Sequence, residues 1–263
     1  MIRTILAKVQ VFKEPAVIFG IASICVWEFL CRAFNISAYL LPTPSQIAQA
    51  AYKHYGLVFV NLLYTLKEVT AGFLAASFLS IILGMLITYY SLFRRILLPY
   101  IVLVQNLPKL ALAPLFIVWF GLTFITNISI VVALAAFPVL INFVAGLEAT
   151  KIEEIKLMRS YNATKWQTFY HVRLFNAMPF LFAGFKLSIV LSVAGAVVAE
   201  FIAGHKGLAY MMILSNTTLE IPLMFVFLFA IGVLGLSLFM VISLAEKVFM
   251  PWSKSRTVRE ATL

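Results

Sequence analysis

The sequence predicts an all-helical, polytopic membrane protein with six transmembrane helices, forming one domain over residues 1–263. Hydrophobic residues make up 63% of the chain and charged residues only 11%, whereas a soluble domain carries roughly 25% charged residues. The mean hydropathy is +1.03. Several apolar runs reach the roughly 20 residues that cross a bilayer as a helix. Open strands are excluded, because lipid would leave their backbone groups without partners.

Six apolar runs place the expected spans. They lie at residues 16–34, 66–90, 96–119, 124–146, 179–203 and 222–245. The third run is interrupted by Pro99, Pro108 and Pro114, and the fourth contains Pro138. Between the first two spans, a pair of prolines precedes Ser45, which is expected to cap a short surface helix.

The basic residues orient the chain. The net charge is +10, but the cations gather at alternate span ends instead of on one nucleic-acid-binding face. Cytoplasmic loops carry such an excess of Lys and Arg, so both termini are expected in the cytoplasm. The residues concerned are Arg3, Lys8, Lys13, Arg94, Arg95, Lys151, Lys156, Arg159, Lys165, Arg173, Lys247, Lys254, Arg256 and Arg259.

No catalytic, cofactor or metal site is expected in this chain. All ten acidic residues are glutamate, and the sequence lacks a phosphate-binding G-x-x-x-x-G-K-[ST] loop. Nucleotide hydrolysis would therefore require another polypeptide. The three histidines are isolated, and Cys25 and Cys31 stand roughly 9 Å apart along a helix, too far for a disulfide.

A long polar segment, residues 148–178, separates the fourth and fifth spans on the predicted cytoplasmic side. It is expected to form two short helices with an elbow at Asn162, a residue that tolerates the left-handed conformation. Thr164 and Gln167 fit the capping box that begins a helix. The second helix is expected to present one stripe, which consists of Trp166, Phe169, Tyr170 and Arg173.

Aromatic residues beside an arginine are typical of protein interfaces. The stripe is therefore a candidate docking surface. Two alternatives remain, since aromatic and basic faces also lie on lipid headgroups or pack on the chain's own helices.

The polar segment resembles the EAA coupling segment of membrane permeases from binding-protein-dependent ABC importers. Departures from that pattern are Lys156 at a usual acid, Asn162 at a usual glycine and Phe175 at a usual proline. The resemblance extends over nearly the whole chain, through Leu41-Pro42-Thr43-Pro44-Ser45, residues 105–115 with Trp119-Phe120-Gly121, Phe137-Pro138 with Asn142, and Ala199-Glu200-Phe201. The similar branch serves nitrate, sulfonates, taurine and thiamine-precursor pyrimidines.

The resemblance implies a type I, MetI-like permease bundle in the bacterial inner membrane. The implied partners are a second permease copy, an ATPase that carries Mg-ATP, and an extracytoplasmic solute-binding protein. The implied solute is a small molecule, with a thiamine-precursor pyrimidine or related heterocycle favoured over sulfonate, taurine or nitrate. The implied ATPase-coupling residues are Glu153, Glu154, Lys156, Arg159, Asn162, Thr164, Trp166, Phe169, Tyr170 and Arg173.

Ionisable groups within spans are costly in lipid and therefore mark candidate functional positions. Lys109, Glu200 and Glu28 are candidates for the solute path, although each can instead have a structural role through a local partner. Lys186 is expected to reach toward the membrane surface with its ammonium group. Lys67 and Glu68 are expected to be solvated at the start of the second span.

A second class of protein also fits a chain of this composition, namely an ion-gradient-driven secondary transporter or channel. Such transporters show repeated halves with broken helices at matching positions. The sequence shows no such repeat, and a secondary transporter needs no cytoplasmic docking segment. The sequence therefore favours the importer permease.

Overall fold

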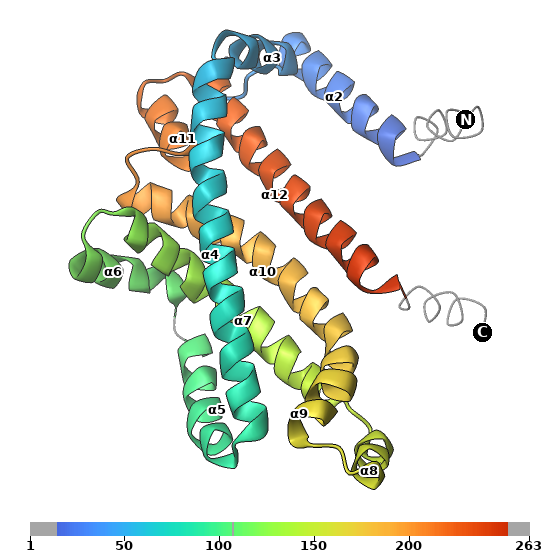
Figure 1. The fold of residues 1–263 in the computed structure, drawn as a ribbon. Coiled ribbons are helices and arrows are strands. Elements are labelled where there is room, and N and C mark those ends of the chain that lie inside the picture. The colour runs from blue at the N-terminus through green and yellow to red at the C-terminus, as the bar shows by residue number, and fades with distance from the viewer. Residues whose placement is uncertain (1–14, 107, 252–263) are drawn as a thin grey trace.

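Three long helices form the centre of the molecule. The computed structural model describes residues 15–106 and 108–251, and this part of the chain is helical, without strands. Helix α7 (Phe124–Glu148) packs along both α4 (Tyr55–Tyr89) and α10 (Leu174–Ala203). In Figure 1 α7 and α10 slant across α4, and α8 lies below the lower ends of α7 and α10. This end, which carries α8 and Arg94, is called the basic end below.

The close approach of α7 and α10 depends on a glycine, which has no side chain at the point of contact. A Cβ atom at Gly195 of α10 would lie 2.9 Å from the Cα atom of Val131 on α7. Val131 is fully buried, in a cluster with Val69 of α4 and Ile189 of α10. Small residues allow such contacts where packing, instead of the hydrophobic effect, drives helix association in lipid.

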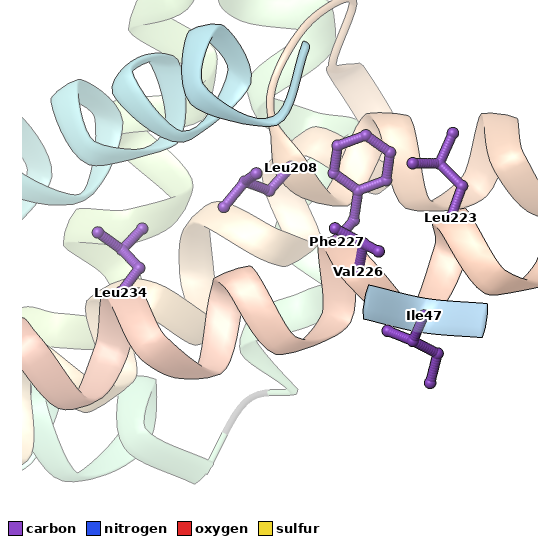
Figure 2. Close-up of a cluster of buried hydrophobic side chains, with 6 residues drawn as sticks. All are labelled: Ile47, Leu208, Leu223, Val226, Phe227 and Leu234. Carbon is purple, nitrogen blue, oxygen red and sulfur yellow. The ribbon is translucent and has the colours of Figure 1, made fainter. Parts of the chain in front are cut away.

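A second cluster holds the opposite end together. Helices α3 (Pro44–Lys53), α11 (Leu208–Thr217) and α12 (Ile221–Phe249) meet there. Figure 2 shows the buried side chains that they share, which are Ile47, Leu208, Leu223, Val226, Phe227 and Leu234. The chain therefore has one packed region around α4, α7 and α10 and another at the end opposite α8.

Helix α2 (Pro15–Ala33) leans away from the centre in Figure 1. Its contact with α12 is aromatic, since the Trp27 ring lies 6.2 Å from the Phe225 ring and 6.3 Å from the Phe229 ring. Cys25 is exposed and Cys31 buried, and both are free thiols. The expectation that they form no disulfide is confirmed.

Four helices of the described residues are long and apolar enough to cross a membrane, at Tyr55–Tyr89, Phe124–Glu148, Lys165–Ala203 and Ile221–Phe249. They cover the second, fourth, fifth and sixth predicted spans. The second begins eleven residues earlier than predicted, because the helix runs without a break from Tyr55 through the mostly apolar residues 55–65. Helix α2 matches the first predicted span in position.

The third predicted span is not one helix. It is divided into α5 (Ser91–Asn106), a short 3₁₀ helix η2 (Lys109–Leu112) and α6 (Ala113–Phe120). Pro108 and Pro114 explain the division, because proline lacks the amide that an α-helix interior requires. The interruption predicted at Pro108 and Pro114 is therefore confirmed, whereas Pro99 lies inside α5.

The short surface helix α3 exists, but Ser45 does not cap it. The Thr43 side chain accepts a hydrogen bond from the Gln46 amide, and the Gln46 side chain accepts one from the Thr43 amide.

Some residues used above lie outside the described part of the chain, namely Leu107 and the terminal cations Arg3, Lys8, Lys13, Lys254, Arg256 and Arg259.

Candidate functional site

The polar segment folds as a helical hairpin at the basic end. Helix α8 (Ile152–Ser160) is followed by an elbow and by α9 (Lys165–Thr168). Asn162 has a φ angle of 52°, and its amide donates to the Arg159 carbonyl at 2.9 Å. The Ala163 amide donates to the Met158 carbonyl at 3.0 Å. The predicted left-handed elbow is confirmed.

The predicted capping box at the start of α9 is also confirmed. The Gln167 amide donates to Thr164 Oγ1 at 3.2 Å, and the Thr164 amide donates to Gln167 Oε1 at 2.8 Å. Each side chain thus satisfies one backbone amide that a helix start would leave without a partner. The capping box therefore fixes the start of the second arm, α9, directly after Thr164.

Phe169 anchors this hairpin to the membrane helices. Its side chain is only 4% exposed and packs with Phe143 and Leu147 of α7. The Tyr89 ring of α4 meets it edge-on, with ring centroids 5.5 Å apart. The hairpin is therefore held by both α4 and α7.

A polar contact holds the first arm of the hairpin. Asn176 of α10 donates a hydrogen bond from Nδ2 to Glu154 Oε2 at 2.5 Å. Since α10 is one of the three central helices, displacement of α8 would strain this bond. This hydrogen bond therefore joins the first arm of the hairpin to α10.

The predicted stripe on the second arm is not exposed along its whole length. Residues 169–173 form one π-helical turn, named η3 (Phe169–Arg173). A π turn rotates the following residues away from regular 3.6-residue spacing. Phe169, the first residue of this turn, is buried, whereas Trp166 and Tyr170 are 68% and 54% exposed. Trp166 stacks on Phe169 with ring centroids 5.5 Å apart.

The exposed face of the hairpin includes residues that the spacing argument missed. Leu157 and Tyr161 are 57% and 77% exposed. Neither belongs to the stripe expected on the second arm, and their large side chains were the available signal. Glu153, Lys156, Arg159 and Thr164 are exposed as well, whereas Arg173 is half-buried with its guanidinium 5.9 Å from the Tyr89 ring centre.

Lys109 does not lie within a regular helix. It begins η2, directly after Pro108, and its side chain is half-buried. The Lys109 ammonium lies over the Phe137 ring of α7, 5.4 Å from the ring centre. A cation over an aromatic face is stabilised electrostatically, so Lys109 has a local partner at the break between α5 and α6.

Glu200 is a structural acceptor at the opposite end. It is 1% exposed. Its carboxylate accepts a hydrogen bond from Thr65 Oγ1 of α4 at 2.5 Å and another from the Ala209 amide of α11 at 2.6 Å. Gly207, with a φ angle of 112°, lies so close to this carboxylate that a Cβ atom would clash with it. Glu200 thus joins α10 to α4 and α11.

Glu68 was expected to be solvated, but the structure places it in the interior. It is fully buried, and Asn127 of α7 donates a hydrogen bond from Nδ2 to Glu68 Oε1 at 2.6 Å. The carboxyl groups of Glu68 and Glu200 are neighbours. The helix extends eleven residues before the predicted span, so Glu68 lies within α4 instead of at its solvated start. Lys67 is exposed, as expected.

Glu28 and Lys186 both have partners. Glu28 pairs with Arg32 at 2.6 Å and accepts a hydrogen bond from the Ser45 amide at 3.0 Å, which ties α2 to α3. Lys186 of α10 pairs with Glu246 of α12 at 2.5 Å instead of reaching outward alone.

The three candidate path residues therefore do not meet in one site. Lys109 lies at the α5–α6 break. Glu28 joins α2 to α3, and Glu200 joins α10 to α4 and α11.

The fold is that of an ABC importer permease. The chain is similar to a solved protein described as an amino acid ABC transporter with histidines, with a TM-score of 0.59 over 76% of this chain and 96% of that one. The sequences are 18% identical, so this likeness concerns the fold alone.

Sequence comparison gives the family. Residues 76–254 match the family described as the inner membrane component of binding-protein-dependent transport systems, and the chain belongs to this family. It is 30% identical to the formylaminopyrimidine transport permease protein ThiX of Halalkalibacterium halodurans, over 92% of this chain and 97% of that one. It is 29% identical to the riboflavin transport system permease protein RibX of Chloroflexus aurantiacus, over 94% of each chain. A putative aliphatic sulfonates permease of Bacillus subtilis, SsuC, is 28% identical over 92% of this chain and 86% of its own length.

The protein is therefore a multi-pass membrane permease of an ABC importer for a small solute. Its family consists of transporter subunits, and no catalytic domain is implied for the chain. The ion-gradient-driven transporter, the other class considered above, is set aside by this membership.

Proposed function

We propose that the α8–α9 hairpin docks on an ATPase subunit and transmits its movement to α4, α7 and α10. One observation carries this proposal: the hairpin exposes Trp166 and Tyr170 while buried Phe169 fixes it to the membrane helices. A rigid attachment of this kind passes a displacement on to the helices as a body. Mg-ATP would bind on the ATPase, and this chain would supply the docking surface.

The arrangement of partners follows from the charge pattern. The basic end faces the cytoplasm, where Lys and Arg are in excess, and both termini lie on that side. The first and third predicted spans, over α2 and over α5 to α6, complete six crossings. Two copies of the chain form the pathway, and a solute-binding protein delivers the solute at the opposite end.

The proposed solute is a nitrogen heterocycle of the formylaminopyrimidine class. Two relatives of nearly equal identity are named for formylaminopyrimidine and for riboflavin, both of which are nitrogen heterocycles. The proposal is tested by measuring whether formylaminopyrimidine, riboflavin or an alkylsulfonate inhibits uptake of the transported solute. Inhibition by the sulfonate alone would contradict it.

The docking role is tested by changing an exposed and a buried aromatic residue of the hairpin. Trp166→Ala should weaken association with the ATPase by about 2 kcal/mol, roughly thirtyfold, because exposed tryptophans dominate many interfaces. Phe169→Ala should instead lower the stability of the permease itself by about 3–5 kcal/mol. ATPase co-purification and ATP-dependent uptake in proteoliposomes measure the first effect, and thermal unfolding in detergent measures the second.

A matched control for the docking test is Phe19→Ala on α2, where the ring is 75% exposed. This variant should keep both ATPase association and uptake. Equal association by the Trp166→Ala protein and the unchanged protein would contradict the docking role. So would uphill uptake by the permease alone, without nucleotide.

Lys109 is the proposed pathway residue, because Glu28 and Glu200 each fasten one helix to another. Lys109→Met removes a charged donor at the α5–α6 break. If the solute contacts this ammonium, the apparent KM for uptake should rise about tenfold, the size expected for a lost charge-assisted hydrogen bond. Uptake kinetics equal to those of the unchanged protein would assign Lys109 to structure.

A further inference from the structure

A cavity of about 270 Å³ separates the end of α4 from the α8–α9 hairpin. The residues used below are Thr88 and Tyr89 of α4 and, from the hairpin, Arg159, Lys165, Thr168 and Arg173. One water takes roughly 30 Å³ in the liquid, so the cavity has room for a small polyatomic ion. It lies on the side of the hairpin that faces α4.

The cavity is strongly basic. Arg159, Lys165 and Arg173 line it, and no acidic residue does. The ion pairs of the described residues join other side chains, Arg32 to Glu28, Arg94 to Glu148 and Lys186 to Glu246. The three cations of the cavity therefore repel one another without a neutralising partner in the described chain.

Neither acid of α8, Glu153 nor Glu154, lines this cavity. Glu154 is bound by Asn176 on the opposite side of α8, where a separate cavity lies. The two threonine hydroxyls of the basic cavity already donate to carbonyls of their own helices, Thr88 to Gly84 and Thr168 to Thr164. Recognition of a ligand would therefore rest on the three cations.

We propose that this cavity binds a phosphate group. Arginine forks match phosphate oxygens in charge and geometry, and two arginines and a lysine converge here. Basic pockets between transmembrane helices on the cytoplasmic side accept phospholipid headgroups, and the same chemistry accepts free phosphate. A phosphate bound between Arg159 or Lys165 and the end of α4 would fix the hairpin relative to α4 and so regulate how far the hairpin moves.

The test uses the full-length permease without an ATPase, in phosphatidylcholine nanodiscs. Inorganic phosphate is titrated calorimetrically, and retention of phosphatidylglycerol is measured by native mass spectrometry in a second arm. The double variant Arg159→Gln/Lys165→Gln should bind phosphate at least about tenfold more weakly, or retain correspondingly less phosphatidylglycerol, since charged hydrogen bonds are lost. Lys151→Gln, an exposed cation outside the cavity, is the matched control and should bind as the unchanged protein does.

Each result has one interpretation. Phosphate binding without lipid retention assigns the site to a soluble phosphate, and the reverse pattern assigns it to a lipid headgroup. The proposal is overturned if the unchanged protein binds neither ligand, or if the double variant binds both normally. In a separate co-purification with the ATPase, a double variant that loses this association but binds both ligands normally would show that these cations meet a protein carboxylate, which also overturns the proposal. Because no ATPase is present in the titration, the phosphate site and the docking role succeed or fail separately.

Discussion

Glu200 connects three helices through the two oxygens of one side chain. Thr65 of α4 donates to one oxygen and the Ala209 amide of α11 donates to the other. Thr65 in turn accepts a hydrogen bond from the Leu208 amide at 2.9 Å. The start of α11, which would otherwise leave buried amides without acceptors, thus depends on a residue of α10.

Replacing Glu200 should therefore destabilise the end of the molecule opposite α8. Glu200→Ala leaves the Ala209 amide and the Thr65 hydroxyl without their acceptor, at about 1–3 kcal/mol for each buried group. Glu200→Gln keeps one acceptor oxygen and a similar volume, so its cost should be smaller. The free energy of unfolding in mixed detergent micelles measures both, and an alanine variant as stable as the glutamine variant would refute this role.

Local rules predicted two residues of the hairpin correctly. Asn162 adopts the left-handed conformation and Thr164 forms the capping box, because both features depend on residues within a few positions along the chain. The burial of Phe169 and Glu68 was not predictable in this way. It depends on Tyr89 for Phe169 and on Asn127 for Glu68, and both of these partners are distant in sequence.

At the scale of elements, the α8–α9 hairpin depends on its elbow. The Asn162 φ angle of 52° costs an ordinary residue about 1–2 kcal/mol. The elbow is therefore where a substitution should loosen the hairpin without touching its packed aromatic anchor.

Asn162→Ala should increase amide hydrogen exchange at Ala163, whose N–H is bonded to the Met158 carbonyl. The expected increase is about five- to thirtyfold, from the 1–2 kcal/mol cost of the left-handed conformation. Asn162→Gly should change the exchange rate by less than about threefold, because glycine adopts positive φ readily. Equal exchange in the alanine and glycine variants would count against a strained elbow.

The third predicted span shows how far element prediction reaches. Apolar length placed a span over residues 96–119, and the structure divides it into α5, η2 and α6. The prolines were visible in the sequence, and they explain why the helix breaks. The directions in which the pieces continue depend on packing, since α6 and η2 both contact α7.

At the scale of the whole molecule, α12 is joined to the centre near the basic end by a charged pair. Lys186 of α10 and Glu246 of α12 lie 2.5 Å apart, with about a quarter of each side chain exposed. Toward the opposite end, α12 packs instead through the apolar cluster with α3 and α11 (Figure 2). The pair therefore adds to the apolar contacts of this half of α12, such as the stacking of Phe249 on Phe182.

Replacing one residue of this pair should lower the free energy of unfolding more than replacing both residues. Lys186→Met leaves the Glu246 carboxylate without its cation, which should cost about 1–3 kcal/mol for a partly exposed pair. Adding Glu246→Met should recover part of that loss. A double-mutant cycle of unfolding free energies measures the coupling, expected at about 0.5–3 kcal/mol, and strictly additive effects would show that the pair does not hold α12.

The sequence by itself determined that the chain is a helical membrane protein, where its long apolar helices lie, and how its polar hairpin turns. These properties follow from apolar length, charge and short-range capping, all of which are local. Only the tertiary structure decided that Phe169 is an anchor, that Glu68 and Glu200 are buried, and that three cations surround one cavity. The reason is physical: whether a side chain on a helix is exposed depends on the neighbouring helices, and these are brought together by residues far apart in the chain.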